Sequence, residues 1–141
     1  MIKLSGQDLT IDKVIDIARN NEKVKLTESA QKKVKKARNM VNELVEEDDV
    51  VYGITTGFGK FSDKRISPRE VLKLQENLIK SHATGTGDPL PREVVRGMML
   101  LRINNLARGH SGIKNQTLDL LVDMLNNDII PWVPEQGSVG A

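Results

Sequence analysis

Cysteine is absent from this sequence of 141 residues, and aromatic residues make up only 3% of it. Without thiols there is no disulfide framework and no thiolate metal site, which favours a protein of the reducing cytoplasm. A core with so few aromatic rings is built mainly from leucine, isoleucine, valine and methionine, and such a core suits helices packed on helices. The length is enough for one hydrophobic core.

Charge of one sign is also lacking, because 21 basic residues oppose 19 acidic ones and leave a net charge of +2. So small a balance gives no strong field toward nucleic acid or a membrane surface. A local basic cluster does lie at residues 32–38, but an acid-rich stretch at residues 43–49 follows it, and no stacking aromatic side chains are interleaved. We interpret the cluster as a solvated helix face and expect no nucleic-acid partner.

Long apolar runs are missing as well. The longest ones are far too short to cross a bilayer, and the first residues lack the pattern of a signal peptide. We therefore expect a soluble, cytoplasmic protein with no membrane partner. The two histidines, His82 and His110, are spaced unlike any common zinc site, so we expect no bound metal.

Apolar residues recur at helical spacing in five stretches of the chain. This spacing predicts helices over about residues 10–19, 27–47, 67–82, 91–107 and 114–126. Thr10 is placed to cap the first helix, and Ser67 followed by Pro68 and Glu70 is a compact helix start. The fourth helix is expected to bury, among others, Val94, Met98 and Leu101. Residues 1–9 hold a short extended segment, and two prolines keep residues 131–134 extended. The pattern predicts an all-α chain with irregular, glycine-rich loops.

Residues 51–61 form a glycine-punctuated loop that carries Tyr52, the only tyrosine of the chain. The loop does not match a Walker phosphate-binding pattern, because Gly53 lies one residue too far from Gly59 and Lys60. It does not match a dinucleotide-binding fingerprint either, because the segment before it is helical in pattern. What remains is a loop that presents one phenol. A tyrosine transfers a proton when hydrogen bonds or positive charge lower its pKa, but without such a context it is more often a packed side chain.

His82 lies at the predicted end of the third helix, where Gly85 and Gly87 interrupt the helical pattern. That position leaves the imidazole able to face a cavity. On general grounds, a lone histidine is more often satisfied at the surface or in the core than engaged in binding. Tyr52 and His82 are thus candidate functional residues whose role depends on their context.

The context is a resemblance carried by four runs of sequence. They are Tyr52–Gly59 (YGITTGFG), Ser81–Gly85 (SHATG), Leu100–Asn104 (LLRIN) and Pro134–Ala141 (PEQGSVGA). In order and spacing, the chain resembles the N-terminal part of an aromatic amino acid ammonia-lyase, and most of all those lyases that act on histidine. The resemblance covers nearly the whole chain. It implies the N-terminal helical part of a fumarase/aspartase-like lyase, a homotetramer whose active sites draw on more than one subunit. Residues 1–141 are then a single N-terminal segment of a larger subunit and not a complete catalytic domain.

The resemblance also implies a chemistry. In the family, an Ala-Ser-Gly tripeptide of the backbone cyclises into methylidene-imidazolone (MIO), an electrophile, and Ala141 matches its alanine. By the same resemblance Tyr52 is the base that removes the β-proton of the substrate, His82 binds the polar end of the substrate ring, and Gly59 offers a backbone contact near it. The expected products are ammonia and the unsaturated acid, which is urocanate if the substrate is histidine. Ala141 is the last residue of the sequence, so the chain is expected to be a fragment, to be cut there, or to continue into the modified group.

Two alternatives remain open. His82 can hydrogen-bond an imidazole nitrogen or a phenol, so a tyrosine ammonia-lyase and an MIO-dependent aminomutase are possible, although Ala83 resembles the histidine enzymes. The second alternative is a small helical interaction module whose basic cluster at residues 32–38 docks an acidic partner or nucleic acid. The lyase and aminomutase hypotheses require Tyr52 for function, whereas the interaction-module hypothesis requires the lysines.

Overall fold

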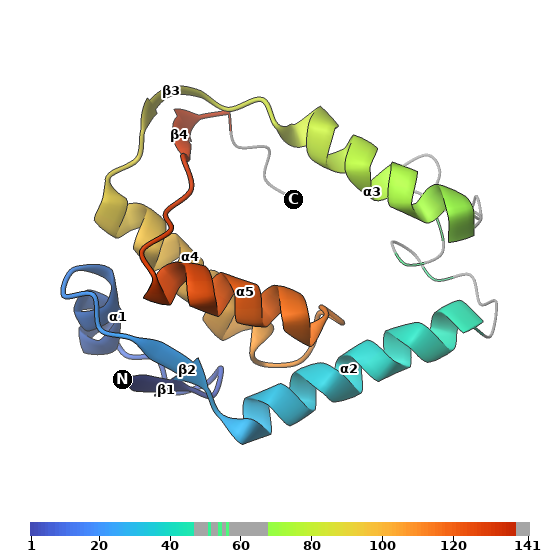
Figure 1. Ribbon diagram of the computed structural model, residues 1–141, viewed down its shortest axis with the longest axis horizontal. Helices are drawn as coiled ribbons and strands as arrows, with labels where there is room; N and C mark the ends of the chain where they lie inside the picture. The colour runs from blue at the N-terminus through green and yellow to red at the C-terminus, as the bar shows by residue number, and fades with distance from the viewer. Residues whose placement is uncertain (47–50, 52–53, 55, 57–67, 138–141) are drawn as a thin grey trace. The chain divides into compact units, whose positions relative to one another are not determined.

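The computed structural model describes residues 1–46, 51, 54, 56 and 68–137 (Figure 1). The chain divides into two compact units, which we describe separately. The first consists of residues 1–39 and 88–133, and the second of residues 40–87 and 134–141. Among the predicted site residues, Tyr52, Gly59 and Ala141 lie outside the described residues, whereas His82 lies within them.

The five predicted helices are confirmed. They are α1 (Ile11–Ala18), α2 (Glu28–Glu46), α3 (Pro68–His82), α4 (Arg92–Leu106) and α5 (Asn115–Asn126). Thr10 caps α1 by accepting a hydrogen bond from the Lys13 backbone N–H at 3.4 Å, and Thr27 accepts one from the Ala30 N–H at 3.2 Å at the start of α2. These hydroxyls satisfy N–H groups that a helix start otherwise leaves without partners.

The first unit also contains a strand pair that the periodicity did not predict. β1 (Ile2–Leu4) pairs in parallel with β2 (Val24–Leu26), with Ile2 opposite Val24. Leu4 and Val24 are buried, so the pair contributes to the core as well as to the backbone hydrogen bonds. The expected extended segment at residues 1–9 is therefore in part a strand.

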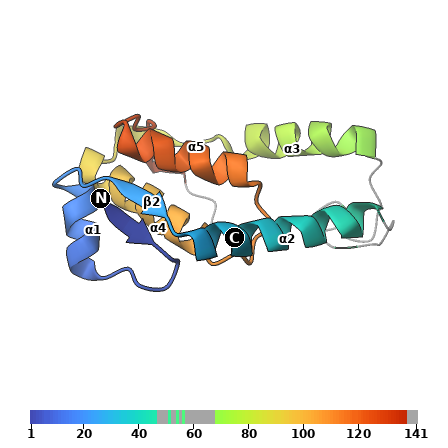
Figure 2. The same ribbon diagram turned by 60° about the horizontal axis from the view of Figure 1, so that its bottom comes forward.

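Helices α1, α4 and α5 belong to the first unit, together with the strand pair and α2 up to residue 39. Within it, α4 contacts both α1 and α5 (Figures 1 and 2). The core is aliphatic, as the composition predicted. Its buried members are Leu4, Ile17, Val24, Val34, Val95, Met99, Leu100, Ile103, Leu106, Leu118, Val122 and Leu125. The prediction that α4 buries all of its apolar side chains was wrong for three of them, because no described residue covers their side of the helix. They are Val94, Met98 and Leu101, which are 41%, 45% and 55% exposed.

Among the described side chains, Arg96 on α4 is the largest that is fully buried, at 2% exposure. Its Nε and Nη2 atoms donate to the Ile17 carbonyl oxygen at 3.2 and 2.8 Å. Its Nη1 atom donates to the Leu125 carbonyl oxygen at 3.0 Å and to the Asp128 carboxylate at 3.1 Å. Ile17 and Leu125 lie in the last turns of α1 and α5, where carbonyl groups lack partners within the helix. One guanidinium therefore satisfies the ends of two helices.

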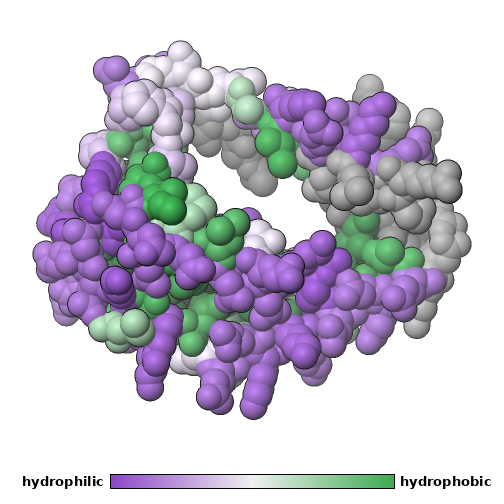
Figure 3. Space-filling view, in the orientation of Figure 1, coloured by the Kyte–Doolittle hydropathy of each residue, from purple (hydrophilic) through white to green (hydrophobic). Residues whose placement is uncertain are grey.

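The four lysines of the basic cluster lie in solvent, as we interpreted the cluster, whereas Arg38 is half-buried and donates to the Gly112 carbonyl oxygen at 3.3 Å. Lys32, Lys33, Lys35 and Lys36 are all exposed, while Val34 between them is 1% exposed. Hydrophilic side chains accordingly line this helix in the space-filling view (Figure 3). The cluster is a solvated face on a helix that the core holds by its opposite side.

Gly109 ends the segment after α4, and we predict that it tolerates no side chain. Its φ angle is +77°, and a Cβ atom there would stand 2.7 Å from the Lys33 carbonyl carbon, which is backbone and cannot rotate away. Gly109→Ala should therefore lower the melting temperature of the whole protein and reduce its free energy of unfolding by roughly 1–3 kcal/mol. Gly97→Ala is the matched control, because that helical glycine has open space around it. It should raise stability by roughly 0.5–1 kcal/mol. Equal effects of the two substitutions would contradict the packing described.

Candidate active site

The C-terminal end of α3 presents His82 to solvent. The helix ends there because Ala83 still donates to the Ile79 carbonyl oxygen, whereas Thr84 turns back to the His82 carbonyl oxygen at 2.9 Å. The next residues leave the helix and enter β3 (Thr86–Pro89). His82 is thus fixed by its backbone at a helix end, as its place in the sequence predicted.

Two polar atoms hold the imidazole ring of His82. Its Nδ1 atom lies 2.9 Å from the Leu78 carbonyl oxygen and 3.0 Å from the Ser81 hydroxyl oxygen. A carbonyl oxygen only accepts, so Nδ1 carries the hydrogen of that contact. The neutral ring then has a bare lone pair on Nε2. His82 consequently offers a hydrogen-bond acceptor to whatever lies beyond the helix end.

A second strand pair joins the segment after His82 to the segment that leads toward Ala141. β3 pairs with β4 (Pro134–Gln136), and the two strands lie side by side in Figure 1. The sequence predicted an extended chain here from its prolines, but not this pairing. The partner strands lie far apart in the sequence, and no local pattern in either strand indicates which segment it pairs with.

Glycines allow the two segments to lie in close contact. A Cβ atom on Gly85 would stand 2.9 Å from the Pro134 ring, and one on Gly137 would stand 2.8 Å from both Gly85 Cα and the Thr84 carbonyl oxygen. Gly137 also has a φ angle of +100°, which side chains rarely allow. The backbone two residues after His82 is therefore in direct contact with the backbone four residues before Ala141.

We predict that Gly137→Ala disturbs this contact. The new methyl group would meet backbone atoms on Gly85 and Thr84, and the positive φ angle adds strain of roughly 1–2 kcal/mol. Because residues 138–141 follow directly, the substitution should lower the activity of the whole protein together with its melting temperature. Gly87→Ala is a control for the strain alone, since Gly87 also has a positive φ angle, +90°, but its new methyl group would meet the flexible Glu135 side chain at 3.0 Å. A Gly137→Ala protein with wild-type activity would contradict the role of this contact.

The loop with Tyr52 is described at three of its residues. Ile54 donates its backbone N–H to the Val51 carbonyl oxygen at 3.1 Å, and the Thr56 side chain is 2% exposed. This loop and His82 both belong to the second unit. Of the predicted site residues the structure thus describes His82 alone, and it places the backbone of Thr84 and Gly85 after it against Gly137.

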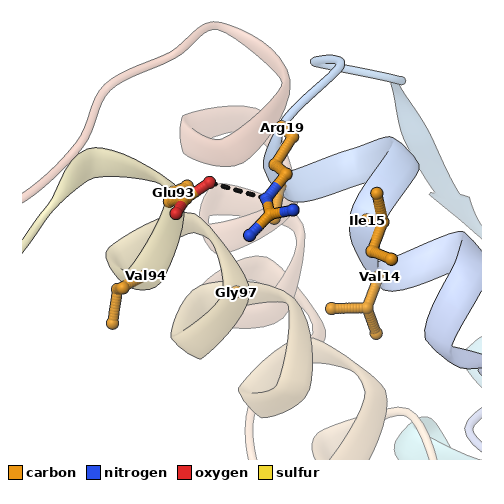
Figure 4. A pocket seen from close by; sticks show the side chains of 7 residues that line it. Val14, Ile15, Arg19, Glu93, Val94 and Gly97 are labelled. Atoms are coloured by element: carbon orange, nitrogen blue, oxygen red, sulfur yellow. Dashed lines mark hydrogen bonds and ion pairs between the residues drawn. The ribbon is translucent and has the colours of Figure 1, made fainter.

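The first unit contains a shallow groove between α1 and α4 with a volume of about 250 Å³. Figure 4 shows apolar side chains along it and the ion pair of Arg19 with Glu93, 2.7 Å between Nε and Oε2. Because that carboxylate is paired and no other titratable group lines the groove, we assign it no chemistry. Among the described residues, no cluster of histidine and carboxylate side chains could hold a metal ion. Within the same residues, no helix is long and apolar enough to cross a membrane.

Solved structures that match this chain include an ergothioneine-degrading enzyme, an ammonia-lyase and an aminomutase. An ergothionase from Treponema denticola matches 98% of this chain and 28% of its own with a TM-score of 0.92 and 35% identity. A histidine ammonia-lyase from Trypanosoma cruzi matches 99% of this chain and 27% of its own with a TM-score of 0.88 and 34% identity. A tyrosine aminomutase from Streptomyces globisporus matches 97% of this chain and 26% of its own with a TM-score of 0.91 and 31% identity.

Comparisons of sequence assign the chain to one family. The profile of the family described as aromatic amino acid lyase matches residues 9–141. The chain therefore belongs to the aromatic amino acid lyase family. Among curated proteins, it is 51% identical to a histidine ammonia-lyase of Alkaliphilus oremlandii over 99% of its length. It is 46% identical to one of Streptococcus gordonii over its whole length. The chain spans 28% of the length of each of these relatives.

Proposed function

We propose that the whole protein is a carbon–nitrogen lyase that eliminates ammonia from L-histidine and gives urocanate, the first step in breaking histidine down. The observation that carries the proposal is 45–51% identity to curated histidine ammonia-lyases over 99–100% of this chain. The tyrosine aminomutase matches the fold equally well but is 31% identical. The likeness in sequence therefore favours histidine elimination over tyrosine chemistry.

The reaction needs a base and an electrophile. The β-proton of an amino acid is only weakly acidic, and its ammonium group leaves poorly. In our proposal, Tyr52 removes the β-proton, and Gly59 contributes a backbone contact near the substrate. MIO, formed from Ala141 and the serine and glycine that follow it in the family, supplies an electrophile that captures the amine.

The described residues fit a prosthetic group at Ala141. Gly137 lies against Thr84 and Gly85 so closely that no side chain fits between them, which supports a fixed approach of the backbone to Ala141. His82 lies two residues from Thr84, so the same contact supports placing Ala141 near the imidazole. A backbone ring needs such fixed neighbours, because a reacting group misplaced by one ångström loses much of its rate.

His82 is proposed to bind the substrate ring through Nε2. The acceptor at Nε2 matches an imidazole N–H, and it also matches the O–H of a phenol. The imidazole of His82 therefore does not choose between histidine and tyrosine by itself. Ala83 next to it and the curated relatives favour histidine.

Turnover of the whole protein with two substrates tests the proposed reaction. We expect ammonia and urocanate from L-histidine, with a kcat/KM for histidine well above that for L-tyrosine. Ammonia from tyrosine but not from histidine would overturn the choice of substrate. A β-amino acid as the main product would identify an aminomutase instead.

The assembly is also part of the proposal. Residues 1–141 form one N-terminal segment of a larger helical subunit, and four subunits form a homotetramer in the cytoplasm. The family supports this assembly, and the exposed apolar residues Val94, Met98 and Leu101 are consistent with further packing on α4. Light scattering of the purified whole protein measures the number of subunits directly.

A further inference from the structure

Ser81 forms a closed triangle of contacts with its neighbours at the end of α3. The Ser81 hydroxyl oxygen lies 2.9 Å from the Leu78 carbonyl oxygen and 3.0 Å from His82 Nδ1. His82 Nδ1 lies 2.9 Å from the same carbonyl oxygen. All three distances are those of good hydrogen bonds.

The donors of this triangle follow from its chemistry. The Leu78 oxygen has no hydrogen to give, so Ser81 Oγ and His82 Nδ1 both donate to it. The hydroxyl has a single hydrogen, so in the third contact its oxygen accepts from the N–H of His82, whose one hydrogen is then shared between the Leu78 and Ser81 oxygens. The triangle is complete only when Nδ1 carries a hydrogen. In the other neutral tautomer, Nδ1 is bare and its contact with the carbonyl oxygen is lost.

The Ser81 hydroxyl is the second partner of His82 Nδ1, beside the Leu78 carbonyl oxygen, and it matters because this helix end is exposed. Both Ser81 and His82 are in solvent, where water competes for each hydrogen bond and a single bond is worth little. A ring with one partner turns more freely than a ring with two. The hydroxyl of Ser81 therefore restricts both the orientation and the tautomer of the imidazole.

We propose that Ser81 is a positioning residue that holds His82 with its hydrogen on Nδ1, so that Nε2 accepts a hydrogen bond from the ring of the substrate. This inference rests on the proposed function, in which His82 binds that ring. It adds that the acceptor at Nε2 is set by the neighbouring serine. The bound ring must then be one that donates, such as an imidazole N–H.

Kinetics of variants of the whole protein test the role of Ser81. Ser81→Ala should raise KM for histidine about fivefold, the effect of one neutral hydrogen bond. It should leave kcat within about twofold, because a contact made equally in ground and transition states affects binding alone. Ser81→Thr keeps the hydroxyl and should restore KM. Lys80→Ala, an exposed neighbour on the same turn, is the control and should match the wild type. Equal KM values for Ser81→Ala and Lys80→Ala would overturn the inference.

A double-mutant cycle separates positioning from a general effect on the helix. If Ser81 acts through His82, then Ser81→Ala should have less than about twofold effect in a His82→Gln background. A fivefold effect that persists in that background would overturn the inference.

Nitrogen-15 NMR of the whole protein with labelled histidine tests the tautomer without turnover. We expect the His82 signal, identified by its loss in His82→Gln, to show a protonated Nδ1 and a bare Nε2 when the ring is neutral. Ser81→Ala should shift it toward a mixture. A protonated Nε2 in the wild type would overturn the inference. A protonated Nδ1 in a protein that does not convert histidine would support the role of Ser81 and contradict the proposed function.

Discussion

Replacement of Tyr52 by phenylalanine should lower kcat and kcat/KM for histidine together, by roughly 10²- to 10⁴-fold. The substitution removes one hydroxyl and keeps the ring, so it removes the proposed base with little change in packing. A group that acts only in the transition state contributes little to binding, and KM should change far less than kcat. Steady-state kinetics on the whole protein measure both quantities.

The control for Tyr52→Phe is the basic cluster of α2. Alanine at Lys32, Lys33, Lys35 and Lys36 together should leave turnover unchanged, because these side chains lie in solvent on the first unit. A helical interaction module predicts the reverse sensitivities. An active Tyr52→Phe protein beside an inactive quadruple lysine variant would therefore contradict the lyase account.

Replacement of Arg96 by methionine should destabilise the protein by about 3 kcal/mol. Methionine fills much of the volume but leaves the buried Ile17 carbonyl oxygen without its donors. The Leu125 carbonyl oxygen loses the guanidinium N–H and keeps the backbone N–H of Asp128 at 3.4 Å. These acceptors belong to the backbone, so no second substitution removes them. The loss should appear as a lower melting temperature. It should also appear as faster amide hydrogen exchange in α1 and α5, the two helices that Arg96 joins.

Arg92→Ala is the matched control for Arg96. Arg92 binds the same carboxylate, with 2.6 Å between its Nη2 atom and Asp128 Oδ1, but both side chains are about half exposed. The hydrogen bond from Arg92 is the main cause that holds the pKa of Asp128 below its ordinary value. Exposed pairs of this kind contribute at most about 1 kcal/mol. Similar losses for Arg92→Ala and Arg96→Met would contradict the role assigned to burial.

The helices could be predicted from the sequence because their signals are local. Apolar residues at helical spacing place α2, α4 and α5, and the hydroxyls of Thr10 and Thr27 sit where helix starts need acceptors. The same pattern could not show which apolar side of α4 is covered. It therefore assigned Val94 and Met98 to the core, although both are more than 40% exposed.

The strand pairs and Arg96 could not be predicted, because their partners are remote. β1 and β4 have three residues each, which is too short for an alternating pattern that would indicate a strand or its partner. Arg96 binds carbonyl groups 79 and 29 residues away, and in the sequence it is one more polar residue on a helix. The place of His82 at a helix end was predictable from the glycines that follow. Its hydrogen bonds to Leu78 and Ser81 needed the folded geometry.

We propose that the backbone at Ala141 becomes part of an electrophile next to His82. Trypsin cuts after Lys114, and no further lysine or arginine occurs before Ala141, so one peptide of the whole protein begins at Asn115 and contains the site. Its mass is the measurement that tests the claim most directly. We predict a peptide two water molecules lighter than its encoded sequence. A peptide with its full encoded mass, from protein prepared without harsh treatment, would contradict the account.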